Sequence, residues 1–367
     1  MGQLLSQPIT EKHITLVQHD HISHSIGEMQ GYRLTMEDAF CDLNERIFVT
    51  EEGLDIRKQD ENTEGDLESL QINIYGVFDG HGGSGASRYV SQKLPSLLRD
   101  ELILTINNLP QVSRSKLLNC QEVLKAIDFP RLLRSSFMKC DSMFYSHHDN
   151  NSGTTAVVLI IFCGYAFVAN SGDSRCILSR KGATKTLSFD HKPRNLGELM
   201  RIHSDGGYVS TNRVNSILAL SRAFGDFSFK MHTENTYSRQ LMFTTAKHKY
   251  TPPEEYQVTA EPDILIHKIT QLDEFFILAC DGIWDCYKSH ELVRLVRHHL
   301  SLGKKLPEIN EIILDNCIRM ANTITGIGFD NMTLIIVALH QDYKDLNNWY
   351  TKMKYRILDE HFGPSGH

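Results

Sequence analysis

The chain has 367 residues, of which 41% are hydrophobic and 23% are charged, and its formal net charge at pH 7 is −7. These values predict one large or two ordinary domains with a sizeable core, and the acidic balance excludes a general nucleic-acid binder, which needs a basic surface. The eight cysteines show no CxxC spacing and several lie in apolar runs, which indicates buried free thiols in a reducing compartment and neither a disulfide frame nor a zinc site.

The start of the chain is polar. We expect residues 1–24 to form an arm outside a domain of residues 25–342, with residues 343–367 as a short C-terminal extension. The arm begins MGQLLS, which fits the N-myristoylation pattern, with Gly2 exposed once Met1 is removed. A chance match in a disordered arm is the alternative. One acyl chain gives only weak, reversible membrane association, so a cytoplasmic, nuclear or peripheral-membrane location stays open.

Helical and strand patterns are mixed along the rest of the chain. Residues 45–71 are dense in charge and predict an exposed loop, whereas apolar residues recur at helical spacing from Ser84 to Ile106, with Pro95 marking a kink or a break. The other expected elements are a second helical region (116–145), a hairpin (154–162 and 165–169), a long loop (231–256), a strand (275–280), an amphipathic helix (290–300), a last strand (332–339) and a short helix after Asp342. This mixture predicts an α+β fold and not a doubly wound sheet.

The segment VFDGHGG, residues 77–83, joins a buried strand to a flexible turn. Asp79 directly follows the apolar run of residues 72–78, and Gly80 with its neighbouring glycines lets the backbone approach a ligand closely. A carboxylate in this position suits a metal ion, and the adjacent His81 can transfer a proton. A strand followed by a Gly-rich turn without a ligand is the alternative.

Three more acidic segments share this design. Asp281 follows the strand of residues 275–280, Asp330 precedes the last strand, and Glu37 and Asp38 lie in GYRLTMEDA. Buried carboxylates that converge from different strands repel one another, and a divalent cation removes that repulsion. Because no His or Cys is clustered with them, the oxygen ligands predict Mg²⁺ or Mn²⁺ and not Zn²⁺. For any one site, an aspartate that caps a turn is the alternative.

Two further aspartates and two cationic side chains complete the candidate site. Asp173 ends the hairpin, and Asp285 follows Asp281 by four residues, a helical spacing that would place both on one face. Asp285 equally suits an N-cap or a first-turn acid. Two ions that share a carboxylate activate water for in-line displacement at phosphorus. Arg33 offers a bidentate fork for the phosphate, and His81 a proton for the leaving alkoxide. The alternatives are an ordinary surface arginine and a histidine that only hydrogen-bonds a ligand carboxylate.

These residues belong to a series of motifs that resembles the metal-dependent Ser/Thr protein phosphatases of the PP2C type, over about residues 25–339. The motifs, in order, are GYRLTMEDA, VFDGHGG, SGTTAVV, ANSGDSR, DHKP, RVNSILALSRAFGD, LACDGIWD and GFDNMT. The MGQ start is similar to a fungal branch of this family with an N-terminal lipid. The resemblance implies phosphorylated proteins as substrates. It also implies a central β-sandwich of two antiparallel sheets with helices on both outer faces, an αββα arrangement of four layers.

The resemblance also implies two Mg²⁺ or Mn²⁺ ions and the residues that hold them. Asp79 would bridge both ions and the Gly80 carbonyl would bind one, while Asp281 and Asp330 would bind the other. The acidic pair at residues 37–38, Glu37 and Asp38, would act largely through metal-bound water.

The remaining roles implied by the resemblance concern the substrate and a third ion. Arg33 would bind phosphate and His81 would be the general acid. Asp173 and Asp285 match positions that hold a third, weaker metal ion, and the role of Thr155 is left open.

Two residues depart from the family pattern. Phe40 stands where histidine often follows MEDA, and Ser216 replaces the glycine of RVNG. These departures concern substrate choice, because every expected ligand position is filled. A catalytically silent scaffold with the same fold is the second hypothesis, and retention of the acidic set argues against it. A metal-dependent nuclease is the third, and the acidic net charge disfavours it.

Overall fold

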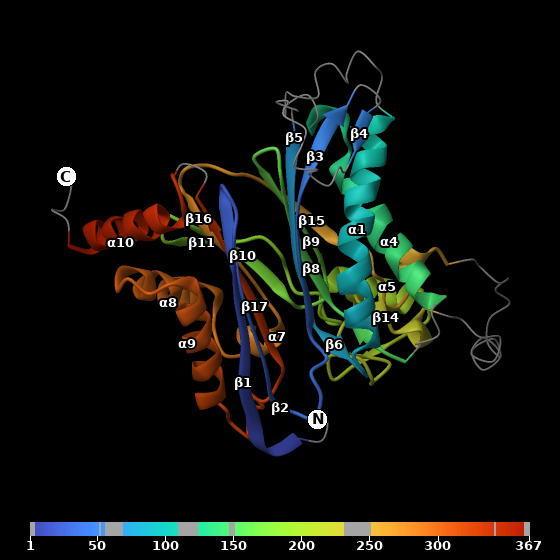
Figure 1. Ribbon diagram of the computed structural model, residues 1–367. Coiled ribbons are helices and arrows are strands. Elements are labelled where there is room, and N and C mark those ends of the chain that lie inside the picture. The colour runs from blue at the N-terminus through green and yellow to red at the C-terminus, as the bar shows by residue number, and fades with distance from the viewer. Residues whose placement is uncertain are drawn as a thin grey trace, which may run out of the picture.

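The computed structural model describes residues 4–50, 53–55, 69–108, 124–146, 151–230, 251–340 and 343–362 of the chain. These residues form two six-stranded antiparallel sheets that pack face to face, with helices on both outer faces (Figure 1). The α+β class and the four αββα layers predicted from the sequence are therefore confirmed. In this part of the chain, no helix combines the length and the apolar character needed to cross a bilayer.

Strands distant in sequence lie side by side in both sheets. The first sheet has the order β1 (Leu4–Gln18), β2 (Ile22–Arg33), β17 (Met332–Leu339), β16 (Asp273–Ala279), β10 (Arg175–Arg180) and β11 (Ala183–Thr186). The second has the order β15 (Asp263–Lys268), β9 (Tyr165–Ser171), β8 (Ala156–Phe162), β5 (Ser69–Phe78), β3 (Ala39–Thr50) and β4 (Gly53–Asp55). The carboxyl ends of β2, β5 and β16 and the start of β17 meet at one edge of the sandwich.

The apolar run of β8 shows how the layers are held together. All seven of its residues are buried, because one face of the second sheet meets the first sheet and the other meets helices. Val157 and Leu159 belong to the core between the sheets, whereas Val158 and Ile160 belong to the core beneath the helices. This two-sided burial explains why β8 reads as a continuous apolar run and not as an alternating pattern.

Two groups of helices cover the sandwich. Helices α1 (Gly85–Asn107) and α4 (Phe129–Tyr145) pack against each other and over the second sheet, and α8 (Ser289–Ser301), α9 (Leu306–Arg319) and α10 (Leu346–Phe362) lie over the first. The single-turn helix α7 (Asp281–Trp284) directly follows β16. Both groups leave the edge where β2, β5, β16 and β17 meet uncovered, because they cover faces of the sheets and not the ends of the strands.

Two small units complete the fold. The first is a three-stranded sheet in the order β14 (Phe224–Gly225), β7 (Gly153–Thr154) and β6 (Gly80–His81). The second, here called the α5 lobe, consists of α5 (Leu196–Ser204), β12 (Val209–Ser210), β13 (Arg213–Val214) and the short helix η2 (Pro253–Glu255). The lobe has a separate small core that includes Ile202, Val214 and Val258.

The terminal segments differ from the sequence prediction. The prediction that residues 1–24 form a polar arm outside the domain is wrong for the described part of this segment. Residues 4–18 form the edge strand β1, which pairs with β2. An edge strand is covered on one side only, so most of its side chains stay exposed and its hydropathy is that of a polar segment. The predicted short C-terminal extension, residues 343–367, contains α10, and Trp349 and Met353 of this helix are buried in the main core; residues 363–367 lie outside the described part. The expected helix after Asp342 is confirmed.

The elements predicted between the two termini can also be compared with the structure. The hairpin, the strands near 275–280 and 332–339 and the helix near 290–300 are confirmed. A single helix continues through Pro95, so no break occurs there. The loop expected at 45–71 is wrong at both ends, where β3, β4 and β5 extend into it, and residues 56–68 lie outside the described part. So do residues 116–123 of the second helical region and 231–250 of the long loop.

Candidate active site and metal centre

A hollow of about 500 Å³ opens at the edge where β2, β5, β16 and β17 meet. It is lined by residues from both sheets, from the turn after β6 and from the α5 lobe. The lining residues are Arg33, Leu34, Thr35, Glu37, Asp79, Gly80, His81, Gly82, Thr155, Asp173, Lys192, Arg213, Leu218, Ala219, Leu220, Asp281, Asp330 and Asn331. The structure thus brings together most of the residues predicted from the sequence.

Three aspartates converge in this hollow. Carboxylate oxygens of Asp79, Asp173 and Asp281 lie within 4.8 Å of one another, although the three residues follow different strands. Burial, and then the negative charges of Asp281 and Asp38, raises the pKa of Asp79 well above its usual range. Burial, and then the charge of Asp173, does the same to the pKa of Asp281. The cluster therefore carries more negative charge than its surroundings balance.

Asp38 lies beside this cluster and is fully enclosed. Burial raises its pKa to about 7, although its Oδ2 accepts a hydrogen bond from Thr333 Oγ1 at 2.8 Å. The Cys280 sulfur lies within 4.8 Å of ligand atoms of Asp38 and Asp79. Burial raises the pKa of the Cys280 thiol well above its usual range, and its sulfur accepts a hydrogen bond from the Thr333 amide at 3.1 Å.

The donor set fits a hard divalent cation. Oxygen atoms of buried carboxylates are the ligands that Mg²⁺ and Mn²⁺ prefer, and a positive ion among them removes the repulsion that raises their pKa values. The observation that carries this conclusion is the convergence of three carboxylates from separate strands within one open hollow.

The backbone around Gly80 and Glu37 is tightly fixed. A Cβ at position 80 would lie 2.2 Å from the Glu37 carbonyl oxygen, so only glycine fits there. The Glu37 amide donates to Asn331 Oδ1 at 2.9 Å, and Asn331 Nδ2 donates to the carbonyl oxygens of Gln30 and Thr35. The Glu37 carboxylate accepts a hydrogen bond from the Gly83 amide at 3.2 Å. This network ties the end of β2 to the start of β17.

Arg33 ends β2 and forms an ion pair with Asp330, which the sequence analysis did not predict. Both side chains are partly exposed in the hollow. The pair places a guanidinium at the rim of the acidic cluster, where it is accessible to an anionic group.

The two aspartates expected to hold a third ion have different surroundings. Asp173 is buried and pairs with Lys192, a residue that the sequence analysis did not single out. Asp285 is exposed and does not line the hollow; its amide donates to the Asp281 carbonyl at 2.7 Å as α7 ends. It is a C-cap residue, so its alternative interpretation as an N-cap or first-turn acid is wrong.

Thr155 supports the backbone of the central aspartate. Its Oγ1 accepts a hydrogen bond from the Asp79 amide at 3.2 Å, and its own amide donates to the Asp79 carbonyl at 2.9 Å. A second hydroxyl, from Ser174, lies 2.9 Å from Thr155 Oγ1. Thr155 therefore fixes the end of β5.

His81 of β6 lines the hollow and is held by a residue that the sequence analysis did not single out. Its Nε2 lies 2.7 Å from Asp226 Oδ2. Burial lowers the pKa of His81, but the hydrogen bond and charge of Asp226 outweigh this effect, and the net shift is upward. The partner of His81 is thus not one of the clustered aspartates.

The sequence analysis assigned no role to four residues of the site: Lys192, Arg213, Asp226 and Asn331. All four lie within the sequence motifs on which the family resemblance rests. Asp226 carried a usable signal, because it directly follows a buried Phe-Gly pair just as Asp79 follows Val77-Phe78.

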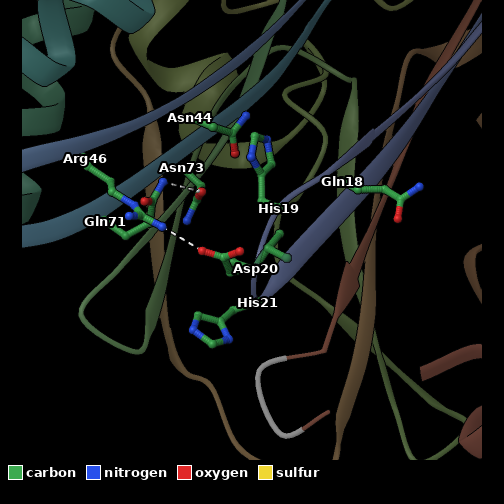
Figure 2. A pocket seen from close by; sticks show the side chains of 9 residues that line it. Gln18, His19, Asp20, His21, Asn44, Arg46, Gln71 and Asn73 are labelled. Carbon is green, nitrogen blue, oxygen red and sulfur yellow. Dashed lines mark hydrogen bonds and ion pairs between the residues drawn. The ribbon is translucent and has the colours of Figure 1, made fainter. Parts of the chain in front are cut away.

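A second polar hollow, of about 480 Å³, lies at the other end of β1 and β2. It is formed by the turn between these strands and by β3 and β5, and Figure 2 shows Asp20 reaching across to Arg46. That pair is joined at 2.6 Å, and Gln71 donates to Asn73 beside it. The Asp20 carboxylate is therefore matched by a cation of the chain, whereas the strongest charges around Asp79 and Asp281 in the first hollow are those of other aspartates.

Comparisons with known proteins agree with this geometry. The family described as Protein phosphatase 2C matches residues 22–325. The chain is 40% identical to Protein phosphatase 2C homolog 4 of Saccharomyces cerevisiae, over 98% of this chain and 99% of that one. It is 36% identical to Protein phosphatase 2C homolog 3 of Schizosaccharomyces pombe, over 97% of this chain and 74% of the relative.

The fold is also found among solved structures. A phosphatase from Toxoplasma gondii superimposes with a TM-score of 0.65 at 22% sequence identity, covering 92% of this chain and 97% of that one. From the family match and these relatives, the chain belongs to the protein phosphatase 2C family and is a metal-dependent serine/threonine protein phosphatase that acts on phosphoproteins.

Proposed function

We propose that the hollow at the edge of the sandwich hydrolyses phosphoserine and phosphothreonine with two Mg²⁺ or Mn²⁺ ions bound in it. Asp79 would be shared by both ions, the Gly80 carbonyl would bind one, and Asp281 and Asp330 would bind the other. The convergence of mutually repelling carboxylates supports this assignment. When bound, the ions supply a nucleophilic water at neutral pH and positive charge next to the phosphate.

Glu37 and Asp38 would bind the ions largely through intervening water. Their positions at the rim and beneath the cluster support this role, since Glu37 lines the hollow and Asp38 is fully enclosed next to Asp79. Thr155 would keep the Asp79 backbone in place.

The chain's own side chains would complete the reaction. Arg33 would bind two phosphate oxygens with its planar guanidinium, which is partly exposed at the rim. An oxygen of water forms a new bond to phosphorus as the bond to the serine or threonine oxygen breaks. His81 would give its proton to that departing oxygen, and it regains a proton from solvent after an alcohol and inorganic phosphate leave.

A third, weaker ion would lie between Asp173 and Asp285. The mutual electrostatic influence of these residues and Asp281 supports a shared site. Lys192 now supplies the positive charge next to Asp173, so binding of this ion requires the Lys192 ammonium to move away.

The test of the main proposal is phosphate release from a phosphothreonine peptide with Mn²⁺ or Mg²⁺, repeated with excess chelator. Turnover that needs the metal and stops with the chelator is the expected result. A folded preparation that binds both ions but releases no phosphate would instead support the silent scaffold. Faster release from a phosphodiester than from the peptide would support the nuclease.

We also propose that Gly2 carries a myristoyl group, which would give weak membrane association in addition to a cytoplasmic or nuclear pool. The MGQLLS start supports this proposal. The intact mass of the protein from its native host decides it, since the expected mass includes one acyl chain and an unmodified terminus contradicts the idea.

A further inference from the structure

We propose that Asp226 is a positioning residue for the reaction: it orients His81 and holds the ring protonated at Nε2, which directs the other ring nitrogen toward the leaving oxygen. This inference rests on the proposed role of His81 as general acid. It assigns a function to the aspartate of the RAFGD segment, which lines neither the metal cluster nor the hollow among the described residues.

The contact itself is short and shielded. Asp226 Oδ2 lies 2.7 Å from His81 Nε2, and Asp226 is 8% exposed. A charge-assisted hydrogen bond in a shielded place is stronger and more directional than one in water. Because a carboxylate only accepts, Nε2 must carry the proton, and Nδ1 is left as the ring nitrogen that can serve the substrate.

The three-stranded sheet β14-β7-β6 brings the two residues together. His81 of β6 and Gly225 of β14 are both paired with Gly153 of β7, on its opposite sides. Asp226 follows Gly225 directly, so its side chain reaches back across β7. A Cβ at position 153 would lie 2.3 Å from Asp226 Oδ2 and 2.4 Å from His81 Nε2. Glycine at this position therefore makes room for the hydrogen bond.

The backbone of Asp226 is held in place from several sides. Its φ angle is +51°, a left-handed conformation that only glycine adopts without strain and that aspartate and asparagine tolerate better than most residues. The Asp226 amide donates to the Ser152 carbonyl, and the preceding Gly225 amide donates to the buried Asp141. Asp141 in turn is paired with the buried Lys230 at 2.7 Å. Such a strained and heavily supported backbone is typical of functional positions.

The consequence for the reaction is orientation. A histidine free to rotate presents either ring nitrogen, or neither, to the departing oxygen. With Nε2 fixed by the hydrogen bond to Asp226, the ring keeps one orientation, and Nδ1 is the nitrogen through which a proton would pass to the departing oxygen.

The experiment compares two substrates in four variants. The substrates are a phosphothreonine peptide, whose alkoxide leaving group needs a proton, and p-nitrophenyl phosphate, whose leaving group needs little protonation. The variants are Asp226→Asn, His81→Gln, the double variant and Asp273→Asn. Asparagine keeps the shape and the tolerance for a left-handed backbone but removes the negative charge.

Asp273→Asn is the matched control. Asp273 Oδ2 lies 2.9 Å from His267 Nε2, so the protein contains a second buried His–Asp pair of the same kind, and this one does not line the active-site hollow. Its loss lowers the melting temperature and leaves the ratio of the two rates unchanged. It therefore separates damage to the fold from damage to the acid.

We expect Asp226→Asn to lower kcat on the peptide about 10- to 100-fold and kcat on p-nitrophenyl phosphate less than about threefold. The Mn²⁺ concentration for half-maximal activity stays the same, because Asp226 is no metal ligand. The double variant matches His81→Gln, because the carboxylate acts only through that ring.

Three other outcomes would contradict the inference, and each would show which part of it is wrong. If Asp226→Asn slows both substrates equally, or lowers activity further in the His81→Gln background, Asp226 is structural only. If His81→Gln discriminates between the substrates and Asp226→Asn does not, only the role of Asp226 is lost. If His81→Gln itself slows both equally, the acid role of His81 falls, and this inference with it.

Discussion

Glu198 of the α5 lobe and Asp281 at the catalytic edge are acids whose surroundings carry opposite charges. Glu198 is 5% exposed and accepts hydrogen bonds from Arg201 and Arg222, both at 2.8 Å. Burial would raise the pKa of Glu198, but Arg222 and Arg201 outweigh it and lower the pKa to about 2. Around Asp281 the strongest charges are those of other aspartates, and the pKa moves upward.

The difference separates an acid that stabilises the fold from one that binds something. The α5 lobe neutralises its buried carboxylate with side chains of the same chain, so the cluster is complete once the lobe folds. At the catalytic edge the strongest charges around Asp281 are those of other acids, although Arg33, Lys192 and Arg213 also line the hollow, so an added cation would neutralise the remaining charge. Removing one carboxylate should therefore have opposite consequences in the two places.

The largest expected effect is on activity at the catalytic edge. Asp281→Asn should lower phosphatase activity by more than about 100-fold, since removing residues that merely orient a metal ligand already costs 10- to 100-fold. In excess chelator the variant should melt at the same temperature as the wild type or higher, because one repelling charge is gone. Isothermal titration with Mn²⁺ and thermal melting measure the two effects. A variant that is markedly less stable in chelator would show that Asp281 is structural.

The next effect is on stability in the α5 lobe. Glu198→Gln should destabilise the protein by about 3–5 kcal/mol, because the mostly buried Arg201 loses its anion and Arg222 keeps only the exposed Asp263 as a carboxylate partner among the described residues. Asp263→Asn is the matched control, since Asp263 also pairs with Arg222 but is 55% exposed, and it should cost less than about 1 kcal/mol. Urea unfolding measures both, and equal losses would refute the comparison.

The same cluster predicts an acid limb of stability. The pKa of Glu198 and that of Asp263 are both lowered to about 2 in the folded protein. A lowered folded pKa means that the stability these groups contribute is complete above their unfolded pKa values of about 4 to 4.5 and is lost as the pH falls toward 2. Thermal melting between pH 2 and 6 with Mg²⁺ present should show this decline, and Glu198→Gln should flatten it. An unchanged slope in that variant would contradict the assignment.

The smallest effect tests a local strain that involves no charge. Ser216 has a φ angle of +63°, where glycine adopts the conformation without strain. Ser216→Gly should stabilise the α5 lobe by about 0.5–1 kcal/mol, the strain relieved less the greater freedom of glycine in the unfolded chain. Ser210→Gly in β12 is the control and should destabilise, because Ser210 is not among the residues with a left-handed backbone. The same sign for both variants would rule out the explanation.

The sequence predicted those site residues in which an acidic side chain follows an apolar strand. Asp79 directly follows β5 and Asp281 follows β16 after Cys280, and both strands are mostly buried, so each acid appears at the end of an apolar run. Their approach within 4.8 Å follows from the sandwich topology, and motif resemblance anticipated it. The layers could be predicted for a similar reason. A sheet that is covered on both faces has strands such as β17, whose residues are all buried and form a continuous apolar run in the sequence.

Pairings between polar residues could not be predicted in this way. The Arg33–Asp330 pair and the His81–Asp226 pair join residues 297 and 145 positions apart, and neither member has a hydropathy pattern that names its partner. The edge strand β1 was missed because its side chains are mostly exposed. Hydrophobic periodicity indicates which residues are buried, but it does not indicate which polar side chains form hydrogen bonds or ion pairs with one another.

The pairing of β1 with β2 has a consequence for where the enzyme works. Leu4 is paired with Arg33, so the first described residue of the chain lies at the catalytic edge (Figure 1). An acyl chain on Gly2 would be two residues away, a reach of at most about 7 Å. Such an anchor would hold the mouth of the active site against the lipid surface. An enzyme held in this way would reach phosphorylated residues close to the membrane surface more readily than residues far from it, and it would dephosphorylate the close ones first.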